Sequence, residues 1–189
     1  MANKNHHIDR YEIRLAGEGG QGMILAGIIL AEAAAIYDGK NACQTQVYGP
    51  EARGGASKAE VIIAQGEIDH PEVITADALV AMSQEACDKY GGNLKREGFL
   101  IVDEEKVGRV PSSRAIKVPI TRLAQESSGK TITANVVALG VLVGLTGVVS
   151  RSAIEKAVAA RAPKGTEAMN KAALEAGFTA ADLIAKKYD

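Results

Sequence analysis

Several features that identify common protein classes are missing from this sequence. It contains no tryptophan and two phenylalanines, and aromatic residues make up 4% of its 189 residues. It therefore lacks the exposed aromatic side chains on which single-stranded nucleic acids stack. A net charge of −1 also leaves no basic surplus to hold nucleic acid or an anionic membrane surface. We expect a chain that binds neither.

Metal-binding and catalytic patterns are missing too. The two cysteines, Cys43 and Cys87, form no CxxC pair and no ligand run for an iron–sulfur cluster. The three histidines, His6, His7 and His70, are not at ligand spacing. No serine or cysteine is accompanied by a base that would make it a nucleophile. The sequence predicts no metal site and no catalytic residue in this chain.

No hydrophobic run is long enough to cross a membrane. The most apolar stretch, residues 134–149, contains Asn135 and three glycines, and it is shorter than the roughly 18–20 residues that a spanning helix needs. Residues 1–10 are polar and lack the apolar centre of a secretion signal, so we expect a flexible N-terminal tail there. Without an export signal or a disulfide framework, a cytoplasmic location is expected.

What the sequence does contain is an alternation of strand and helix patterns. Hydrophobic residues make up 47% of the chain, which is enough for one sizeable core. The alternation predicts a single α/β domain over residues 11–189, with three layers (α/β/α), a largely parallel or mixed sheet and a helical C-terminal part. Strands are predicted at residues 11–16, 41–48, 59–64, 78–82, 99–103 and 115–118, and helices at 23–37, 84–94, 122–125, 132–149, 152–160 and 167–187.

A glycine-dense turn, GEGGQG at residues 17–22, separates the first predicted strand from the first predicted helix. Glycine allows tight turning and close approach of the backbone to a ligand, and the following helix offers unpaired N–H groups to a phosphate. A dinucleotide site would also need an acid at the end of the second strand. That strand ends in Gln46-Val47-Tyr48, so a phosphate-binding or close-contact turn is favoured. A tight crossing in which no side chain fits remains the alternative.

A second glycine-bearing loop, GPEARGGAS at residues 49–57, carries one arginine, Arg53. The rigid Gly-Pro start and the Gly-Gly pair preset the backbone, so the guanidinium is suited to meet a phosphate or carboxylate. Lys58 follows within reach of the same region. The alternative is a surface turn in which Arg53 pairs with Glu51.

Two features of the apolar segment at residues 134–149 bear on its role. Asn135 at its start either orients a ligand or has a structural role. Gly140, Gly144 and Gly147 are spaced by four and three residues, which indicates close packing of one helix face against another helix or subunit.

Ordered segments along the chain resemble the gamma subunits of 2-oxoacid:ferredoxin oxidoreductases. The resemblance covers nearly the whole chain after the N-terminal tail, and it is closest to the 2-oxoglutarate type through residues 44–55. Relatives that act on pyruvate, branched-chain oxoacids or indolepyruvate share the fold. The segments include GEGGQG at 17–22, QTQVYGPEARGG at 44–55, AMSQEA at 81–86, LIVD at 100–103 and NVVALG at 135–140.

The resemblance implies a subunit that is inactive alone. The family's complexes oxidatively decarboxylate a 2-oxoacid, transfer the acyl group to coenzyme A and reduce ferredoxin. Thiamine diphosphate, Mg²⁺ and [4Fe–4S] clusters are then expected on alpha, beta and delta-type partner subunits, and the isolated chain can form a homodimer. This chain would help assembly and wall the coenzyme A side of the site. The residues expected there are Gly17, Gly19, Gly20, Gln21, Gly22, Arg53, Gly54 and Gly55.

Two other functions stay open on the residues alone. A free-standing nucleotide-binding dehydrogenase would use the glycine turn but needs the missing ribose-binding acid. A non-enzymatic binding module would fit the shortage of catalytic groups.

Overall fold

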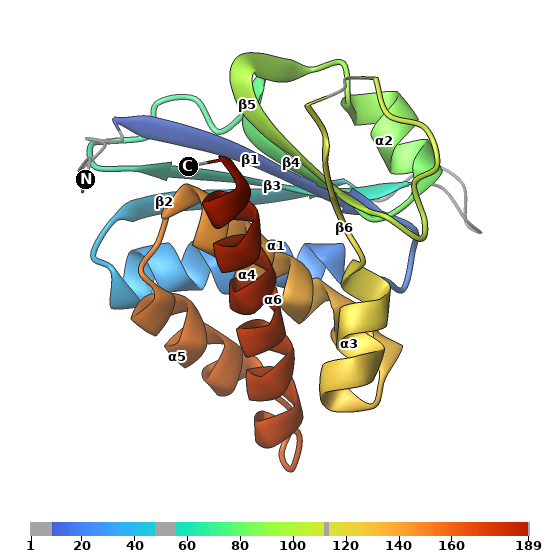
Figure 1. Cartoon of the computed structure of the whole chain (residues 1–189). Helices are drawn as coiled ribbons and strands as arrows, with labels where there is room; N and C mark the ends of the chain where they lie inside the picture. Colours follow the sequence, from blue (N-terminus) through green and yellow to red (C-terminus); the bar gives the residue numbers. More distant parts are fainter. Residues whose placement is uncertain (1–8, 48–55, 112–113, 189) are drawn as a thin grey trace.

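A computed structural model of the chain describes residues 9–47, 56–111 and 114–188. They form one α/β unit around a six-stranded sheet with the order β2-β3-β1-β4-β5-β6 (Figure 1). Strands β1, β4, β5 and β6 run parallel, whereas β3 is antiparallel to both of its neighbours. The predicted mixed sheet is therefore confirmed. The strands are β1 (Arg10–Gly17), β2 (Asn41–Val47), β3 (Ser57–Ala64), β4 (Ala76–Ala81), β5 (Leu94–Asp103) and β6 (Ile116–Val118).

Helices cover the two faces of the sheet unequally. Helices α1, α4, α5 and α6 lie on one side of the sheet, and the short α2 lies on the other (Figure 1). The three predicted layers are present, but α2 is the one helix of the third layer in the described part of the chain. The helical segments are α1 (Met23–Glu32), η1 (Ala33–Tyr37, a π-helical turn), α2 (Gln84–Tyr90), α3 (Ile120–Ser128), η2 (Thr131–Thr133), α4 (Ala134–Thr146), α5 (Arg151–Arg161) and α6 (Glu167–Tyr188).

The central strands are apolar on both faces because both faces are covered. Ile13 and Leu15 of β1 point into the large core beneath the main helical layer, whereas Ala16 points into a smaller core under α2. Arg14 faces that second side as well and is only 3% exposed. Its Nε donates to the Glu60 carboxylate at 2.8 Å, and a second guanidinium nitrogen donates to the Val73 carbonyl at 2.9 Å.

Helix α4 is buried from Ala134 to Val143 and packs closely against α6. A Cβ built on Gly140 would lie 2.5 Å from the Leu174 carbonyl oxygen, and one built on Gly177 would lie 2.3 Å from the Val137 carbonyl oxygen. Glycine at these two positions lets the helix backbones touch. The packing role predicted for Gly140 is confirmed, whereas Gly147 has another role, because it ends α4 with a φ of +61°.

Element bounds follow the predictions to within about three residues except at α2, which ends at Tyr90 and not at residue 94, and at the start of β5. The first helix continues into the π-helical turn η1, and Gly39 follows with a φ of +62°. Strand β5 begins at Leu94, five residues before its predicted start, since Leu94 pairs with Ala76 of β4. Residues 1–8 of the expected tail lie outside the described residues, while Arg10 is the first residue of β1. No described helix has the length and apolar character needed to span a membrane.

Candidate ligand-binding site

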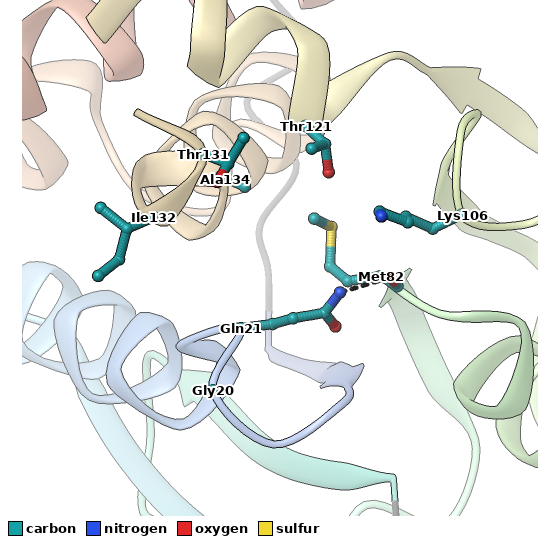
Figure 2. A pocket seen from close by; sticks show the side chains of 8 residues that line it. All are labelled: Gly20, Gln21, Met82, Lys106, Thr121, Thr131, Ile132 and Ala134. Atoms are coloured by element: carbon teal, nitrogen blue, oxygen red, sulfur yellow. Dashed lines mark hydrogen bonds between the residues drawn. The ribbon is translucent and has the colours of Figure 1, made fainter. Parts of the chain in front are cut away.

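A cavity of about 360 Å³ lies at the carboxyl edge of the parallel strands. Residues that follow β1, β4 and β5 line one side of it, and the starts of α3 and α4 line the other (Figure 2). Ligands of open α/β sheets bind at this edge. The described residues lining the cavity are Gly20, Gln21, Met82, Lys106, Thr121, Thr131, Ile132 and Ala134.

The glycine turn is the part of this edge that sequence reasoning located. Gly20 and Gly22 have φ angles of +92° and +73°, which only glycine adopts without strain. A Cβ on Gly17 would lie 2.3 Å from Oε1 of Gln21, and Gly17 therefore lets that side chain fold back over the turn. Gly19 has open space around it and is in the lining of neither hollow described here.

Gln21 braces the turn from within. Its Oε1 accepts a hydrogen bond from the Glu18 N–H at 2.8 Å, and its Nε2 donates to the Met82 carbonyl at 3.0 Å (Figure 2). The side chain thus ties the turn to the end of β4. Gln21 lines the cavity, but its amide is already hydrogen-bonded inside the chain, so its observed role is to fix the loop's shape.

Asn135 supports the same turn from α4. Its Nδ2 donates to the Gly22 carbonyl at 3.3 Å, and its Oδ1 accepts from the Val136 N–H at 2.9 Å. A Cβ on Gly22 would lie 2.6 Å from Nδ2 of Asn135. Of the two roles considered for Asn135, the structural one is observed. Its side chain holds Gly22, the N-cap residue of α1, against α4.

Three residues of this edge were not singled out from the sequence. The fully buried Asp103 carboxylate, at the end of β5, accepts from the Glu105 N–H at 3.1 Å and from both the N–H and the hydroxyl of Thr121. The Lys106 N–H donates to the Asp103 carbonyl at 3.1 Å. The Lys106 and Thr121 side chains point into the cavity (Figure 2). The sequence gives little indication of these residues, because Asp103 and Lys106 belong to a polar run, DEEK, that matches no binding motif.

A second hollow of about 390 Å³ lies on the other side of Ile132 and shares Gly20 and Ile132 with the cavity. Its lining is mainly apolar and includes Leu25, Val136 and Met169. Gly22 lines this groove and not the cavity. Of the glycine-turn residues expected to line the site, the structure therefore brings Gly20, Gln21 and Gly22 to one hollow or the other.

The second predicted loop is not part of the described site. Arg53, Gly54 and Gly55 lie outside the described residues. Lys58, which was expected to help bind an anion, points to the other face of the sheet. Its ammonium lies 2.9 Å from the Glu60 carboxylate and 5.5 Å from the centre of the Tyr90 ring.

Sheet order explains why a dinucleotide does not fit the glycine turn in the usual way. In that fold the second strand lies beside the first and carries the ribose-binding acid next to the turn. Here β3 separates β2 from β1, so the end of β2 is displaced by two strand spacings, roughly 9–10 Å. The ribose position beside the turn has no acid from β2.

No group of three or more His, Cys, Asp or Glu side chains in residues 9–47, 56–111 and 114–188 is placed to hold a metal ion. Cys43 and Cys87 are both free thiols. Burial, with a smaller contribution from Asp88, raises the pKa of the Cys87 thiol, which leaves it protonated at neutral pH and unreactive.

Comparison with known proteins gives consistent matches. The sequence profile of pyruvate ferredoxin/flavodoxin oxidoreductases matches residues 12–180. A 2-oxoglutarate synthase subunit, KorC of Methanocaldococcus jannaschii, is 50% identical over 95% of this chain and 98% of its own length. The crystal structure of the gamma subunit of a keto/oxoacid ferredoxin oxidoreductase from Geobacter sulfurreducens PCA is 51% identical, with a TM-score of 0.84 over 92% of this chain and 97% of that chain.

A more distant solved structure shares the fold. The 2-oxoglutarate:ferredoxin oxidoreductase from Magnetococcus marinus, with 2-oxoglutarate, coenzyme A and succinyl-CoA bound, is 22% identical to this chain. The TM-score is 0.80 over 93% of this chain and 31% of that one.

Proposed function

Because this chain belongs to the pyruvate ferredoxin/flavodoxin oxidoreductase family, we propose that it is the gamma subunit of a 2-oxoglutarate:ferredoxin oxidoreductase. The assembled enzyme decarboxylates 2-oxoglutarate, transfers the succinyl group to coenzyme A and passes the electrons to ferredoxin. The observation that carries the proposal is the 50% identity to a 2-oxoglutarate synthase subunit over nearly the full length of both chains.

In this proposal the chain supplies a wall of the coenzyme A site and contacts for assembly. The turn at Gly20 and Gln21 places backbone against the cavity, and the N–H groups of the first turn of α1 follow directly after Gly22. Such N–H groups favour the phosphates of coenzyme A. Gly17 and Gly19 give the turn its shape. Arg53, Gly54 and Gly55, which lie outside the described residues, are proposed to supply a cation for an anionic group of the ligand.

The remaining chemistry belongs to other subunits. Thiamine diphosphate, Mg²⁺ and the [4Fe–4S] clusters are held by alpha, beta and delta-type partners, and ferredoxin meets the complex there. Residues 11–189 act as one domain, and the complex works in the cytoplasm. A chain of this kind contributes binding surface and geometry, while the electron transfer runs through the cofactors of its partners.

The first test is to tag the chain in its native host and purify it without oxygen. We expect thiamine-binding and iron–sulfur subunits to co-purify, and the preparation to reduce a viologen dye when both 2-oxoglutarate and coenzyme A are present. Pyruvate and 2-oxoisovalerate serve as substrate controls. A chain that purifies alone and binds NAD would contradict the proposal, and faster turnover of pyruvate would contradict the assignment of 2-oxoglutarate.

A further inference from the structure

The cavity at the carboxyl edge carries a positive charge that no group in the described part of the chain neutralises. Lys106 is the one charged residue among the described residues that line it, and its amine points into the space between Thr121 and Gln21 (Figure 2). From this geometry we infer that Lys106 and Thr121, with the backbone at Gly20, bind a phosphate group of coenzyme A. The identity of the ligand rests on the function proposed above, whereas the anion-binding property rests on the cavity itself.

The acidic residues near Lys106 are directed elsewhere. Its chain neighbour Glu105 has its carboxylate 3.9 Å from the Arg122 guanidinium, outside the cavity lining. Asp103 points into the protein and is fully buried. Within the described residues, the Lys106 ammonium has no carboxylate partner to leave before an anion arrives, and ion pairing with a bound phosphate is favoured.

Asp103 fixes the positions of both lining residues. Its carboxylate accepts a hydrogen bond from the Thr121 N–H at 3.0 Å. Its backbone carbonyl accepts from the Lys106 N–H at 3.1 Å and from the Val107 N–H at 2.9 Å. The buried carboxylate therefore holds the start of α3 and the turn after β5 at one spacing. Asp103 is a positioning residue, because it contacts the residues that line the cavity and not the cavity itself.

The shape of the two hollows fits a ligand with one charged and one apolar part. The cavity volume of about 360 Å³ lies at the lower end of the range for small-molecule sites, roughly 300–1,000 Å³, so it holds one end of a long ligand. Beyond Ile132 the groove is mainly apolar, and Gly20 belongs to both linings. A phosphate placed at Lys106 would leave the rest of the molecule to continue past Gly20.

The other described cations near this edge lie outside the cavity lining, and two of them, Lys130 and Arg161, line the groove. The Arg161 guanidinium makes an ion pair with Glu32 of α1, and Lys58 is paired with Glu60 on the other face of the sheet. Arg53 lies outside the described residues. Lys106 is therefore the one described lysine in the lining of the cavity itself, whereas Lys130 lines only the groove.

The test uses the assembled complex and compares Lys106→Gln with Lys117→Gln. Lys117 is an exposed lysine of β6 that is absent from the cavity lining, so both variants remove the same charge. We expect Lys106→Gln to raise the KM for coenzyme A about tenfold, as the loss of one hydrogen bond to a charged group predicts. The KM for 2-oxoglutarate should stay within about twofold of the wild type, and Lys117→Gln should change neither KM.

Two further measurements separate binding from a folding defect. Lys106→Arg keeps the charge and should restore most of the coenzyme A affinity. Pantetheine, an acyl acceptor without phosphate, should be used equally well by the wild type and by Lys106→Gln. A normal KM for coenzyme A in Lys106→Gln overturns this inference and leaves the proposed function intact. A wild-type complex without coenzyme A-dependent activity instead contradicts the proposed function itself.

Discussion

The contact between α4 and α6 predicts that Gly140→Ala destabilises the chain. A Cβ at this position would lie 2.5 Å from the Leu174 carbonyl oxygen and 2.9 Å from Cα of Gly177. Both neighbours are backbone atoms, so relief requires the helices to separate by roughly 1 Å before ordinary contact distances return. Because the two helices pack along much of their length, that separation weakens contacts far from the substitution.

Two opposing terms set the expected magnitude. Alanine favours a helix interior by about 1 kcal/mol relative to glycine, while overpacking of a close contact costs about 1–3 kcal/mol and occasionally more. Since the obstructing atoms belong to the backbone, we expect the upper end of the cost and a net loss of about 2 kcal/mol. For a chain of this size that corresponds to a fall in Tm of roughly 4–8 °C.

Urea unfolding followed by far-ultraviolet circular dichroism measures the effect. The midpoint should fall with little change in m, because the native fold is kept. Gly92→Ala is the control, since a Cβ there meets nothing within 4 Å, and we expect a change within about 0.5 kcal/mol. The double variant Gly140→Ala/Gly177→Ala should lose less stability than the sum of the two single losses. One separation of α4 from α6 relieves the clashes of both added methyl groups. A Gly140→Ala chain as stable as the wild type would refute the reasoning.

Three other substitutions test separate parts of the structure. Glu60→Gln removes the carboxylate partner of the buried Arg14, so we expect a loss of about 3 kcal/mol in urea unfolding; Glu97→Gln, at an exposed carboxylate, should have little effect, and equal losses would contradict this account. Gln21→Ala removes both hydrogen bonds that brace the glycine turn, and isothermal titration of the assembled complex should show weaker coenzyme A binding than in the wild type. Burial raises the pKa of Asp38, but hydrogen bonds from the Ser150 hydroxyl and N–H outweigh it, so the pKa lies below its usual 3.8. Its stabilising contribution is therefore complete above the unfolded pKa and lost as the pH falls through the folded value. Asp38→Asn should flatten the fall of the urea midpoint below about pH 4, and an unchanged acid limb would exclude Asp38 as its source.

Local sequence patterns predicted the elements well because the relevant signals are local. The run of Ala, Ile and Leu after Gly22 indicated α1. Serine is a preferred N-cap residue, and the Ser150 hydroxyl indeed accepts the Ala153 N–H at the start of α5. The glycine turn was placed correctly between a strand and a helix for the same reason. Two of its glycines have the positive φ that makes the residue type informative.

Features that depend on distant partners were not predictable in this way. Strand β5 starts early because Leu94 meets Ala76, although residues 94–98 read as polar. The direction of Lys58 depends on Glu60 and Tyr90 on the far face of the sheet. Lys106 lines the cavity only because the turn after β5 is brought to the same edge as β1, and nothing in its neighbouring residues indicates that arrangement.

The hydrogen bond between Asn135 and Gly22 also has a consequence for the order in which the protein can mature. It joins residues 113 positions apart, and α4, which carries Asn135, packs in turn against α6 through Gly140 and Gly177. A nascent chain that has finished its first strand, turn and helix still lacks the support for that turn. The cavity wall formed by this turn is therefore completed only after the C-terminal helix has been synthesised and docked, so a chain interrupted before α6 would present an incomplete cavity.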